Sequence, residues 1–248
     1  MMKEGIYSRA RYLIVGDQCI TVEFGKAVNE EINDRVRKMY QALGGGKIRG
    51  VVEFFPAFRS VSVFYDPSAI GAKDLVRELR KLEASLGSLV FPQPQTFEIP
   101  VLYGREFLND LERGADFLKL APEELIAIHS APIYRVYMNG ALGGTAFIKM
   151  PQSLASLPRK KTPSLWMPAG AVMLAGGLGC LFKAMDGPSG WNAIGKCPLR
   201  QWFPEKDPPL LISAGDLVKY RAIDEGEYEE IRALVAEGKY RLPVLQPG

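Results

Sequence analysis

The chain contains a single imidazole, His129, so a relay of the Ser-His-Asp or Cys-His type would depend on that one residue. His129 stands near the end of an expected helix and is followed by Ser130, Ala131 and Pro132. The interpretation that we favour is a capping or partly buried histidine. The alternative is a proton carrier, or a hydrogen-bond partner of a substrate at the mouth of a barrel. The residues alone show no complete catalytic constellation.

Two neighbouring cations, Arg159 and Lys160, could hold a carboxylate or a phosphate, because arginine offers a bidentate fork and lysine a point charge. Together with Lys161 they form a basic run, for which a solvated loop is the simpler explanation. Trp191 follows the turn 187–190. A tryptophan there is more often a core or rim anchor than a platform for a ligand.

Glycine-rich turns supply two further candidates. Residues 176–179 look like a phosphate loop, but they lack the Walker spacing and its lysine and open no helix, so a tight barrel turn explains them better. Gly215-Asp216 predicts an ordinary hairpin turn with a carboxylate at its tip. Three cysteines without a CxxC pair suit a reducing compartment, and with one histidine we expect no metal site.

Composition narrows the class of protein. The 248 residues suffice for one large or two ordinary domains, and 47% hydrophobic with 24% charged residues is typical of a soluble globular protein. The net charge is only +3 and the basic residues are spread out, so we expect no nucleic-acid binding. No segment approaches the roughly 18 to 20 apolar residues that cross a bilayer, and residues 1–5 lack a signal peptide's apolar stretch. We therefore expect a cytoplasmic protein that does not contact a membrane.

The first ninety residues alternate between strands and helices. The expected elements are a strand, a helix, a hairpin and a second helix, at residues 19–24, 28–43, 51–65 and 75–86. Asn29 is placed to cap the first helix, and Gly44 to end it. This order predicts a small α+β sandwich of the ferredoxin-like type over residues 1–92.

Residues 91–95 contain two prolines and predict a domain boundary. Beyond it we expect a strand, two helices and another strand, at residues 97–103, 107–118, 122–129 and 134–138. From Gly140 to Tyr220 glycine and proline recur every few residues between short apolar runs, which favours a β-barrel. We assign residues 93–225 to this barrel domain and residues 226–248 to a C-terminal helix and tail.

Short motifs follow one another in a characteristic order. They are Val22-Glu23-Phe24-Gly25, Tyr65-Asp66-Pro67, Ile99-Pro100-Val101, Glu106-Phe107, Ile128-His129-Ser130, Pro158-Arg159, Pro168-Ala169-Gly170, Gly190-Trp191 and Gly215-Asp216. Together they resemble the allophanate hydrolase subunit 1 family along nearly the whole chain. That family includes the B-type subunit of bacterial 5-oxoprolinase, the sporulation histidine-kinase inhibitor and part of the carboxyltransferase domain of urea carboxylase, subdomains C and D.

The resemblance implies a small α+β domain followed by a cyclophilin-like β-barrel. It implies work beside a larger, C-type subunit with a related barrel. With an A-type, lactam-binding subunit, the complex would open 5-oxoproline to glutamate at the expense of ATP, with Mg bound by the whole complex. In the catalytic pocket we expect His129, Arg159 and Lys160. The substrate-binding residues that we expect beside them are Tyr134, Gly144, Ser189, Trp191 and Asp216.

The chain also departs from the family pattern. Segments 140–145 and 176–182 lack the family's usual aromatic residues, proline and glutamine, and Ser164 stands where an arginine is usual. Such changes reshape a pocket and weaken its grip on an anion. Two alternatives to an enzyme subunit therefore stay open. One is a non-catalytic regulator or scaffold that binds a partner such as a histidine kinase. The other is a carboxyltransferase-like module beside a biotin carrier on another chain.

Overall fold

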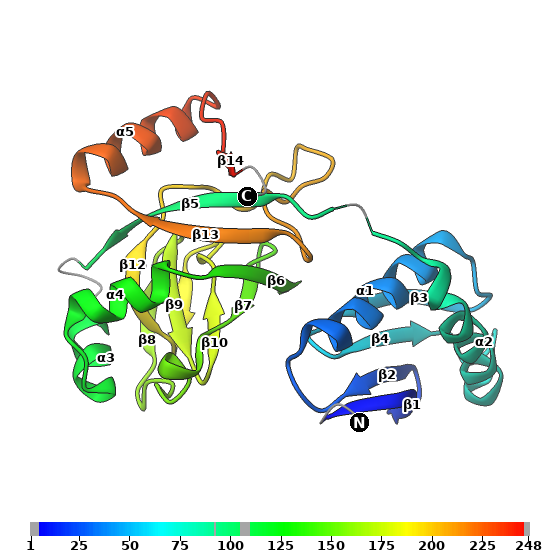
Figure 1. Cartoon of the computed structure of the whole chain (residues 1–248). Coiled ribbons are helices and arrows are strands. Elements are labelled where there is room, and N and C mark those ends of the chain that lie inside the picture. Colours follow the sequence, from blue (N-terminus) through cyan, green and yellow to red (C-terminus); the bar gives the residue numbers. More distant parts are fainter. Residues whose placement is uncertain (1–4, 92, 105–109, 246–248) are drawn as a thin grey trace. The chain divides into compact units, whose positions relative to one another are not determined.

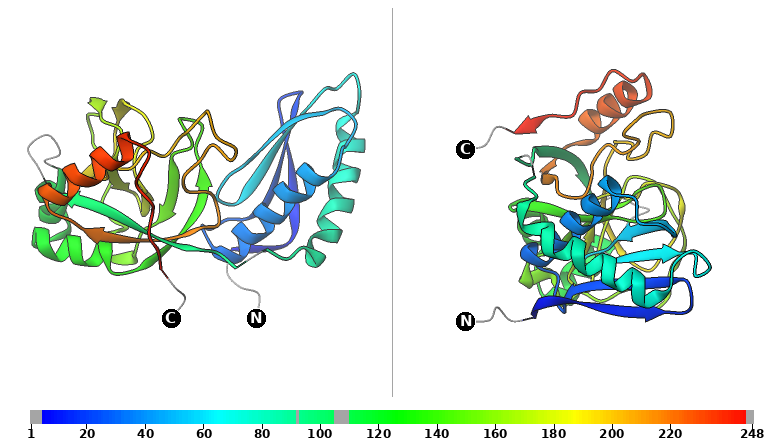
Figure 2. Two further views of the ribbon diagram at one scale, coloured as in Figure 1. Left: turned by 90° about the horizontal axis from the view of Figure 1, so that it is seen from above. Right: turned by 90° about the vertical axis from the view of Figure 1, so that its right-hand side faces the viewer.

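The computed structural model describes residues 5–91, 93–104 and 110–245 and divides the chain into two compact units, residues 1–93 and 94–248 (Figure 1). Figure 2 gives two further views of the same ribbon. Three sequence expectations fall wholly or partly outside the described residues: Pro92 at the boundary, the Glu106-Phe107 motif, and the start of the helix expected from residue 107.

The first unit is a four-stranded antiparallel sheet in the order β1-β2-β4-β3 with two helices. Its elements are β1 (Ile6–Val15), β2 (Cys19–Gly25), α1 (Glu30–Gly45), β3 (Val51–Pro56), β4 (Ser60–Tyr65), α2 (Ala72–Ser85) and the 3-10 helix η1 (Leu86–Ser88). Buried side chains of β2, such as Val22, share one core with Ile32 of α1 and Leu75 of α2. The expected hairpin and both expected helices are confirmed.

Helix α1 begins where its sequence predicts. The Asn29 side chain accepts hydrogen bonds from the backbone N–H groups of Glu31 (2.8 Å) and Ile32 (3.3 Å). The carboxylates of Glu30 and Glu31 lie in the first turn, where the helix dipole favours negative charge. The helix continues one residue past the expected stop at Gly44.

The ferredoxin-like order expected for this unit is not confirmed. That order runs β-α-β-β-α-β, whereas the described chain runs β-β-α-β-β-α. The elements from β2 to α2 follow the expected order, but the strand beside β2 is β1, which precedes them. No residue of β1 is buried, so its sequence lacks the alternation that marks a half-buried strand.

The second unit contains a closed barrel of seven described strands, in the order β12-β9-β10-β7-β6-β13-β5, with β5 pairing back to β12. The strands are β5 (Thr96–Tyr103), β6 (Ile133–Asn139), β7 (Ala146–Lys149), β9 (Ala171–Ala175), β10 (Leu178–Cys180), β12 (Asn192–Lys196) and β13 (Leu217–Ala222). Figure 1 shows β5 and β13 side by side, and these two strands run parallel. The expected β-barrel is confirmed.

Further elements surround the barrel. They are α3 (Asp110–Leu118), α4 (Pro122–Ser130), the 3-10 helix η2 (Gln152–Leu154), β8 (Ser164–Met167), β11 (Gly187–Ser189), α5 (Glu225–Ala236) and β14 (Val244–Leu245). Strands β8 and β11 pair only with each other among the described strands and form a two-stranded antiparallel ribbon. The tail joins the barrel, because Tyr228 and Ile231 of α5 enter the barrel's core and β14 pairs with β5.

The main core of this unit lies inside the barrel, because six of its strands contribute to it. Its members include Ile99, Val136, Ile148, Val172, Ile194 and Val218. Alternate residues of β9 point the other way: Ala171 and Met173 enter a smaller cluster with Met167, Cys180 and Ala193. This second cluster therefore lies on the outer surface of the barrel, beneath the ribbon. Among the described residues no helix combines the length and apolar character needed to span a membrane.

Closure of the barrel requires a glycine at position 195. A Cβ there would lie 2.7 Å from Cγ1 of Val101 and 2.9 Å from the carbonyl oxygen of Leu102, and both atoms belong to β5, the strand that β12 must reach. Gly195→Ala should lower the free energy of unfolding by about 1–3 kcal/mol, the usual cost of overpacking. Urea unfolding followed by tryptophan fluorescence measures this, since all three tryptophans lie in the second unit.

Gly226→Ala in α5 is the matched control. There a Cβ would meet only Asp224 Oδ1 at 3.4 Å, and alanine favours a helix. Equal unfolding free energies for Gly195→Ala and the wild type would contradict the requirement for glycine at the closure.

Candidate functional site

Four of the residues expected in the site lie together at the ribbon. The backbone N–H of Lys160 donates to the carbonyl oxygen of Gly190 (2.7 Å), which places the segment 158–161 beside the end of β11. Ser189 lies in β11, and Trp191 follows Gly190. We call this surface, with the outer apolar cluster beneath it, the ribbon face.

Lys160 is engaged within the protein. Its ammonium donates to Asp110 Oδ2 (2.9 Å) and to Ser164 Oγ (2.7 Å), and its side chain is only 12% exposed. Asp110 also accepts from the backbone N–H of Ala193 (3.0 Å) and pairs with Arg113 (3.1 Å). The charge of Lys160 is therefore balanced, and its evident role is to tie the loop after residue 157 to α3 and β12.

Asn192 continues this network beneath the surface. Its side chain is fully buried, and its amide donates to the carbonyl oxygens of Pro158 (2.8 Å) and Leu174 (2.9 Å). Its Oδ1 accepts from the Arg113 guanidinium. Sequence reasoning assigned no site role to Asp110, Arg113 or Asn192. The contacts that connect them, from Asp110 to Lys160 and from Arg113 to Asn192, span fifty or more residues of the chain.

Arg159 is the available cation of the pair. It is exposed, and among the described residues its guanidinium has no ion pair or hydrogen bond. A Cβ at Gly190 would lie 3.4 Å from Nη2 and 3.5 Å from Nε of Arg159, so the missing side chain at Gly190 lets the guanidinium lie flat against the backbone. An arginine held this way presents its remaining N–H groups to solvent and to an anion.

Ser189 and Trp191 form the apolar side of the same surface. The Ser189 hydroxyl accepts from the backbone N–H of Trp191 (3.2 Å) and lies 3.4 Å from Sδ of Met173. The Trp191 and Phe147 rings are 5.7 Å apart between centroids, and both contact the outer cluster. The expectation of Trp191 as a wall beside Arg159 fits this arrangement, and its role in binding stays a prediction.

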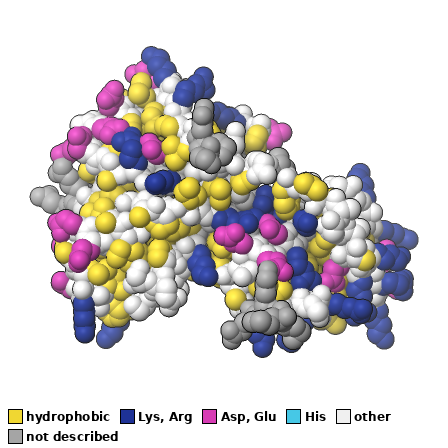
Figure 3. All heavy atoms as spheres, viewed as in Figure 1, with side chains coloured by type: hydrophobic (Ala, Val, Ile, Leu, Met, Phe, Trp, Pro, Cys, Tyr) yellow, Lys and Arg dark blue, Asp and Glu magenta, His cyan; other side chains and the backbone are white. Residues whose placement is uncertain are grey.

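His129 and Tyr134 lie elsewhere, inside the barrel unit. His129 is fully buried, its Nδ1 hydrogen-bonds with the Tyr103 hydroxyl (2.8 Å), and its ring stacks on Tyr220 (4.3 Å between centroids). Burial lowers the pKa of His129 to about 3 and raises the pKa of Tyr134. No histidine side chain shows on the face drawn in Figure 3. The arrangement fits the structural interpretation of His129, and a role as a proton carrier stays a prediction.

Gly144 and Asp216 support loops. The Gly144 carbonyl oxygen accepts from the amides of Asn139 (2.9 Å) and Gln201 (3.1 Å), and a Cβ at Gly144 would lie 2.2 Å from Leu210. Asp216 Oδ2 accepts from the backbone N–H of Ser213 (2.8 Å). The structure places Asp216 at a turn, but this turn is not the hairpin that the sequence predicts, because the following strand β13 pairs with β5 and β6 and not with the preceding strand β12. These hydrogen bonds of Gly144 and Asp216 do not involve the ribbon.

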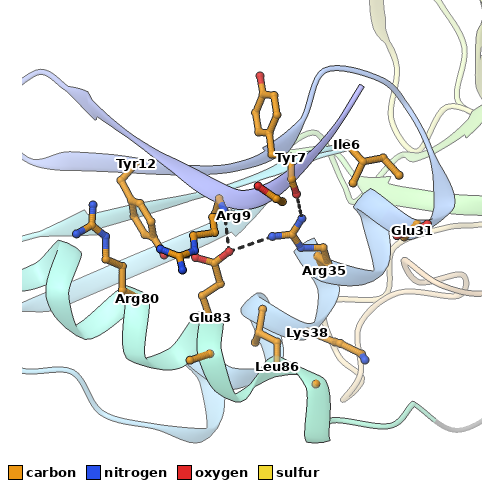
Figure 4. Close-up of a pocket in the computed structure, with 14 residues that line it drawn as sticks. Ile6, Tyr7, Arg9, Tyr12, Glu31, Arg35, Lys38, Arg80, Glu83 and Leu86 are labelled. Atoms are coloured by element: carbon orange, nitrogen blue, oxygen red, sulfur yellow. Dashed lines mark hydrogen bonds and ion pairs between the residues drawn. The ribbon is translucent and has the colours of Figure 1, made fainter. Parts of the chain in front are cut away.

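The first unit has a hollow of about 1020 Å³ between β1, α1 and α2 (Figure 4). Glu83 lies in its wall and binds the backbone N–H of Ala10 (2.7 Å), the Tyr12 hydroxyl (2.7 Å) and the Arg35 guanidinium (3.0 Å). Arg35 in turn donates to the carbonyl oxygen of Tyr7. Strand β1 is an edge strand, and its register with β2 shifts between Ile6 and Arg11. The bonds from Glu83 and Arg35 satisfy backbone groups of β1 at this irregular edge and hold the strand against the helices.

Comparison with known proteins decides the family. A family model described as carboxyltransferase domain, subdomain C and D, matches residues 10–212. The chain belongs to this family. The resemblance seen in the short motifs is thereby confirmed.

Known proteins are similar to this chain over most of its length. The B-type subunit of 5-oxoprolinase from Bacillus subtilis is 36% identical over 230 residues, which cover 88% of this chain and 95% of that protein. The solved structure of TTHA0988 is 31% identical with a TM-score of 0.71, and the match covers 84% of this chain but only 40% of that one. The urea carboxylase of Kluyveromyces lactis has a TM-score of 0.78 at 19% identity, covering 98% of this chain and 25% of that one, which shows the fold alone.

The buried state of His129 predicts a pH dependence. In an unfolded chain a histidine takes up a proton below about pH 6.5, whereas His129 in the fold stays neutral down to about pH 3. Its contribution is complete above pH 6.5 and is lost as the pH falls toward 3. The free energy of unfolding should therefore drop by about 1 kcal/mol between pH 7 and 5.5.

Urea unfolding at both pH values measures this difference, and His129→Gln is the comparison. The window isolates His129 because it is the only histidine and carboxylates titrate mainly below about pH 5. A wild type and a variant with the same pH dependence would show that His129 does not remain buried and neutral.

Proposed function

We propose that this protein is the B-type component of an ATP-dependent complex that opens a small lactam or amide, as a 5-oxoprolinase does. The observation that carries the proposal is the 36% identity to the B-type subunit of 5-oxoprolinase, which extends over 95% of that protein. The proposed partners are a larger C-type subunit with a related barrel and an A-type, lactam-binding subunit. We further propose that the barrel is of the cyclophilin-like type and that the complex works in the cytoplasm.

The ribbon face is the proposed contribution of this chain to the site. Opening an unactivated amide places negative charge on the amide oxygen, and fixed cations near that oxygen lower the barrier. Arg159 supplies such a cation, with its guanidinium against Gly190 and its outer N–H groups unengaged among the described residues. Trp191 and Phe147 supply apolar surface next to it.

The described residues give no direct support to a Mg–ATP site of this chain's own. Among them no group of three or more His, Cys, Asp and Glu side chains is placed to hold a metal ion. Gly176 and Gly177, with φ of +58° and +79°, form the turn between β9 and β10 rather than the start of a helix, as the sequence predicts. We propose that ATP and Mg are bound by the assembled complex, since a Mg–ATP site commonly uses only one or two protein carboxylates and several subunits can contribute them.

Reconstitution tests the proposal. The chain should co-purify from its native host with C-type and A-type subunits, and the complex should release glutamate from 5-oxoproline only with ATP. Arg159→Ala should lower kcat/KM by roughly 100-fold, as loss of one charge-stabilising donor does, with the assembly intact. Lys161→Ala, an exposed neighbour, is the matched control and should retain the wild-type rate.

A recovered complex without ATP-dependent turnover on 5-oxoproline or related small amides would contradict the enzyme proposal. Co-purification with a biotin carboxylase would favour a carboxyltransferase-like module instead.

A second candidate function is a scaffold or regulator that binds a partner protein. The observation that favours it is the exposure of two adjacent large apolar side chains on β8, Leu165 (93%) and Trp166 (59%). Exposed apolar patches often mark a surface that binds another protein. If Leu165→Ser with Trp166→Ser abolishes recovery of a histidine kinase while no turnover is found, this candidate replaces the first. Loss of turnover in Arg159→Ala with intact assembly would exclude it.

A further inference from the structure

Lys183 is a buried lysine at the ribbon face that the sequence did not mark. It follows β10, and only 8% of the residue is exposed. Its backbone is fixed on both sides, because its N–H donates to the carbonyl oxygen of Ala171 (2.8 Å) and its carbonyl oxygen accepts from Gly170 (2.7 Å). The backbone from which the side chain starts is therefore tied to the barrel by hydrogen bonds.

The ammonium of Lys183 has no balancing carboxylate among the described residues. Its Nζ donates to the carbonyl oxygen of Met185, and no second acceptor is found within the described chain. Asp186 is close in sequence, but it is exposed and its Oδ1 accepts from the backbone N–H of Ala169 (2.7 Å). Buried lysines are almost always paired, and an uncompensated buried charge costs several kcal/mol. Among the described residues, the Lys183 ammonium therefore lacks the further acceptor that a buried charge requires.

Lys160 shows what a balanced lysine looks like in the same unit. It is similarly buried, yet it has Asp110 and Ser164 as partners. The contrast between the two lysines favours a ligand at Lys183, since the described residues supply a carboxylate and a hydroxyl for the Lys160 ammonium and a single carbonyl oxygen for that of Lys183.

The surroundings leave one side of the ammonium open. A Cβ at Gly187 would lie 3.5 Å from Nζ of Lys183, so the absence of a side chain there leaves space next to the charge. Gly187 has a φ of +147°, a conformation that other residues rarely adopt. The buried Cys180 lies near the other side of the Lys183 ammonium. Burial raises the pKa of the Cys180 thiol to about 12, and the nearby positive charge of Lys183 opposes that rise.

We propose that Lys183, with the open flank at Gly187, binds a small oxyanion, namely a carboxylate or phosphate group, on the ribbon face. The existence of this site does not depend on the proposed function, but the inference that the anion belongs to a substrate or reaction intermediate rests on it. Arg159 lies against Gly190, three residues farther along the same segment, or roughly 10 Å at the rise of a strand. The two cations can then hold two polar ends of one small molecule, with Ser189 between their positions along the segment and Trp191 next to Arg159's contact at Gly190.

Anion binding by the purified full chain tests the site. Sodium phosphate and sodium acetate are titrated separately at constant ionic strength made up with chloride, and tryptophan fluorescence is followed because Trp166 and Trp191 flank β11. A saturable response to one or both anions is expected from the wild type. Lys183→Met should weaken binding at least tenfold, because it removes the charge that holds the anion. Lys161→Met, which removes an exposed charge of the same kind, should leave binding unchanged.

Thermal melting separates a binding role from a structural one. Because Lys183→Met removes an unpaired buried charge, it should melt no lower than the wild type in chloride, and the added stability that phosphate or acetate gives the wild type should disappear. A stronger response to phosphate assigns the site to a phosphoryl group, and a stronger response to acetate assigns it to a carboxylate.

Three results would overturn the proposal. One is equal anion binding by the wild type and Lys183→Met. Another is a Lys183→Met protein that melts well below the wild type in chloride, which would make Lys183 structural. The third is a wild type without saturable binding whose partner subunits no longer associate after Lys183→Met, which would assign the missing acceptor to a partner's carboxylate. None of these depends on turnover, so a failed reaction assay leaves the site's test intact.

Discussion

The hydrogen-bonded pairing of β12 with β5 is the constraint on which the second unit depends, because it turns a sheet with open edges into a closed barrel. Gly195 allows the two backbones to approach, and the bond from Gly104 N–H to the Ile194 carbonyl oxygen (3.1 Å) extends the closure. Once the barrel is closed, alternate residues of β9 must point inward and outward. The inward set fills the core, and the outward set becomes the floor of the ribbon face.

The ribbon face is consequently tied to the core rather than built on independent loops. Asn192 shows the connection, since it sits in β12 next to the closure and bonds both the β9 backbone and the segment that carries Arg159. Asp110 adds a second tie, from α3 to Lys160 and to Ala193 of β12. A group held by such ties loses little conformational entropy when it engages a ligand, which is what a preorganised site requires.

Local patterns predicted the parts of the molecule that local interactions decide. Helix α1 and its Asn29 cap, the hairpin of β3 and β4, and the turn at Gly176-Gly177 follow from spacing and backbone preference. The barrel was predicted as a class, but its strand order was not, because β12 meets β5 about ninety residues away. The sequence did not predict strand β1, because none of its residues is buried and its sequence therefore lacks the alternating pattern of a half-buried strand. Long-range contacts also decide the roles of the predicted site residues. Lys160 is paired with Asp110, fifty residues away, whereas the neighbouring Arg159 has no partner among the described residues, and no local sequence signal distinguishes the two.

Three positively charged side chains of the barrel unit thus differ in their burial and in the partners that balance their charge. Lys160 is neutralised by Asp110 and serves the fold, Arg159 is exposed and unengaged among the described residues, and Lys183 is buried with a single carbonyl as its described acceptor. A buried charge is tolerated only where something balances it. Natural folds keep such imbalances chiefly where function uses them.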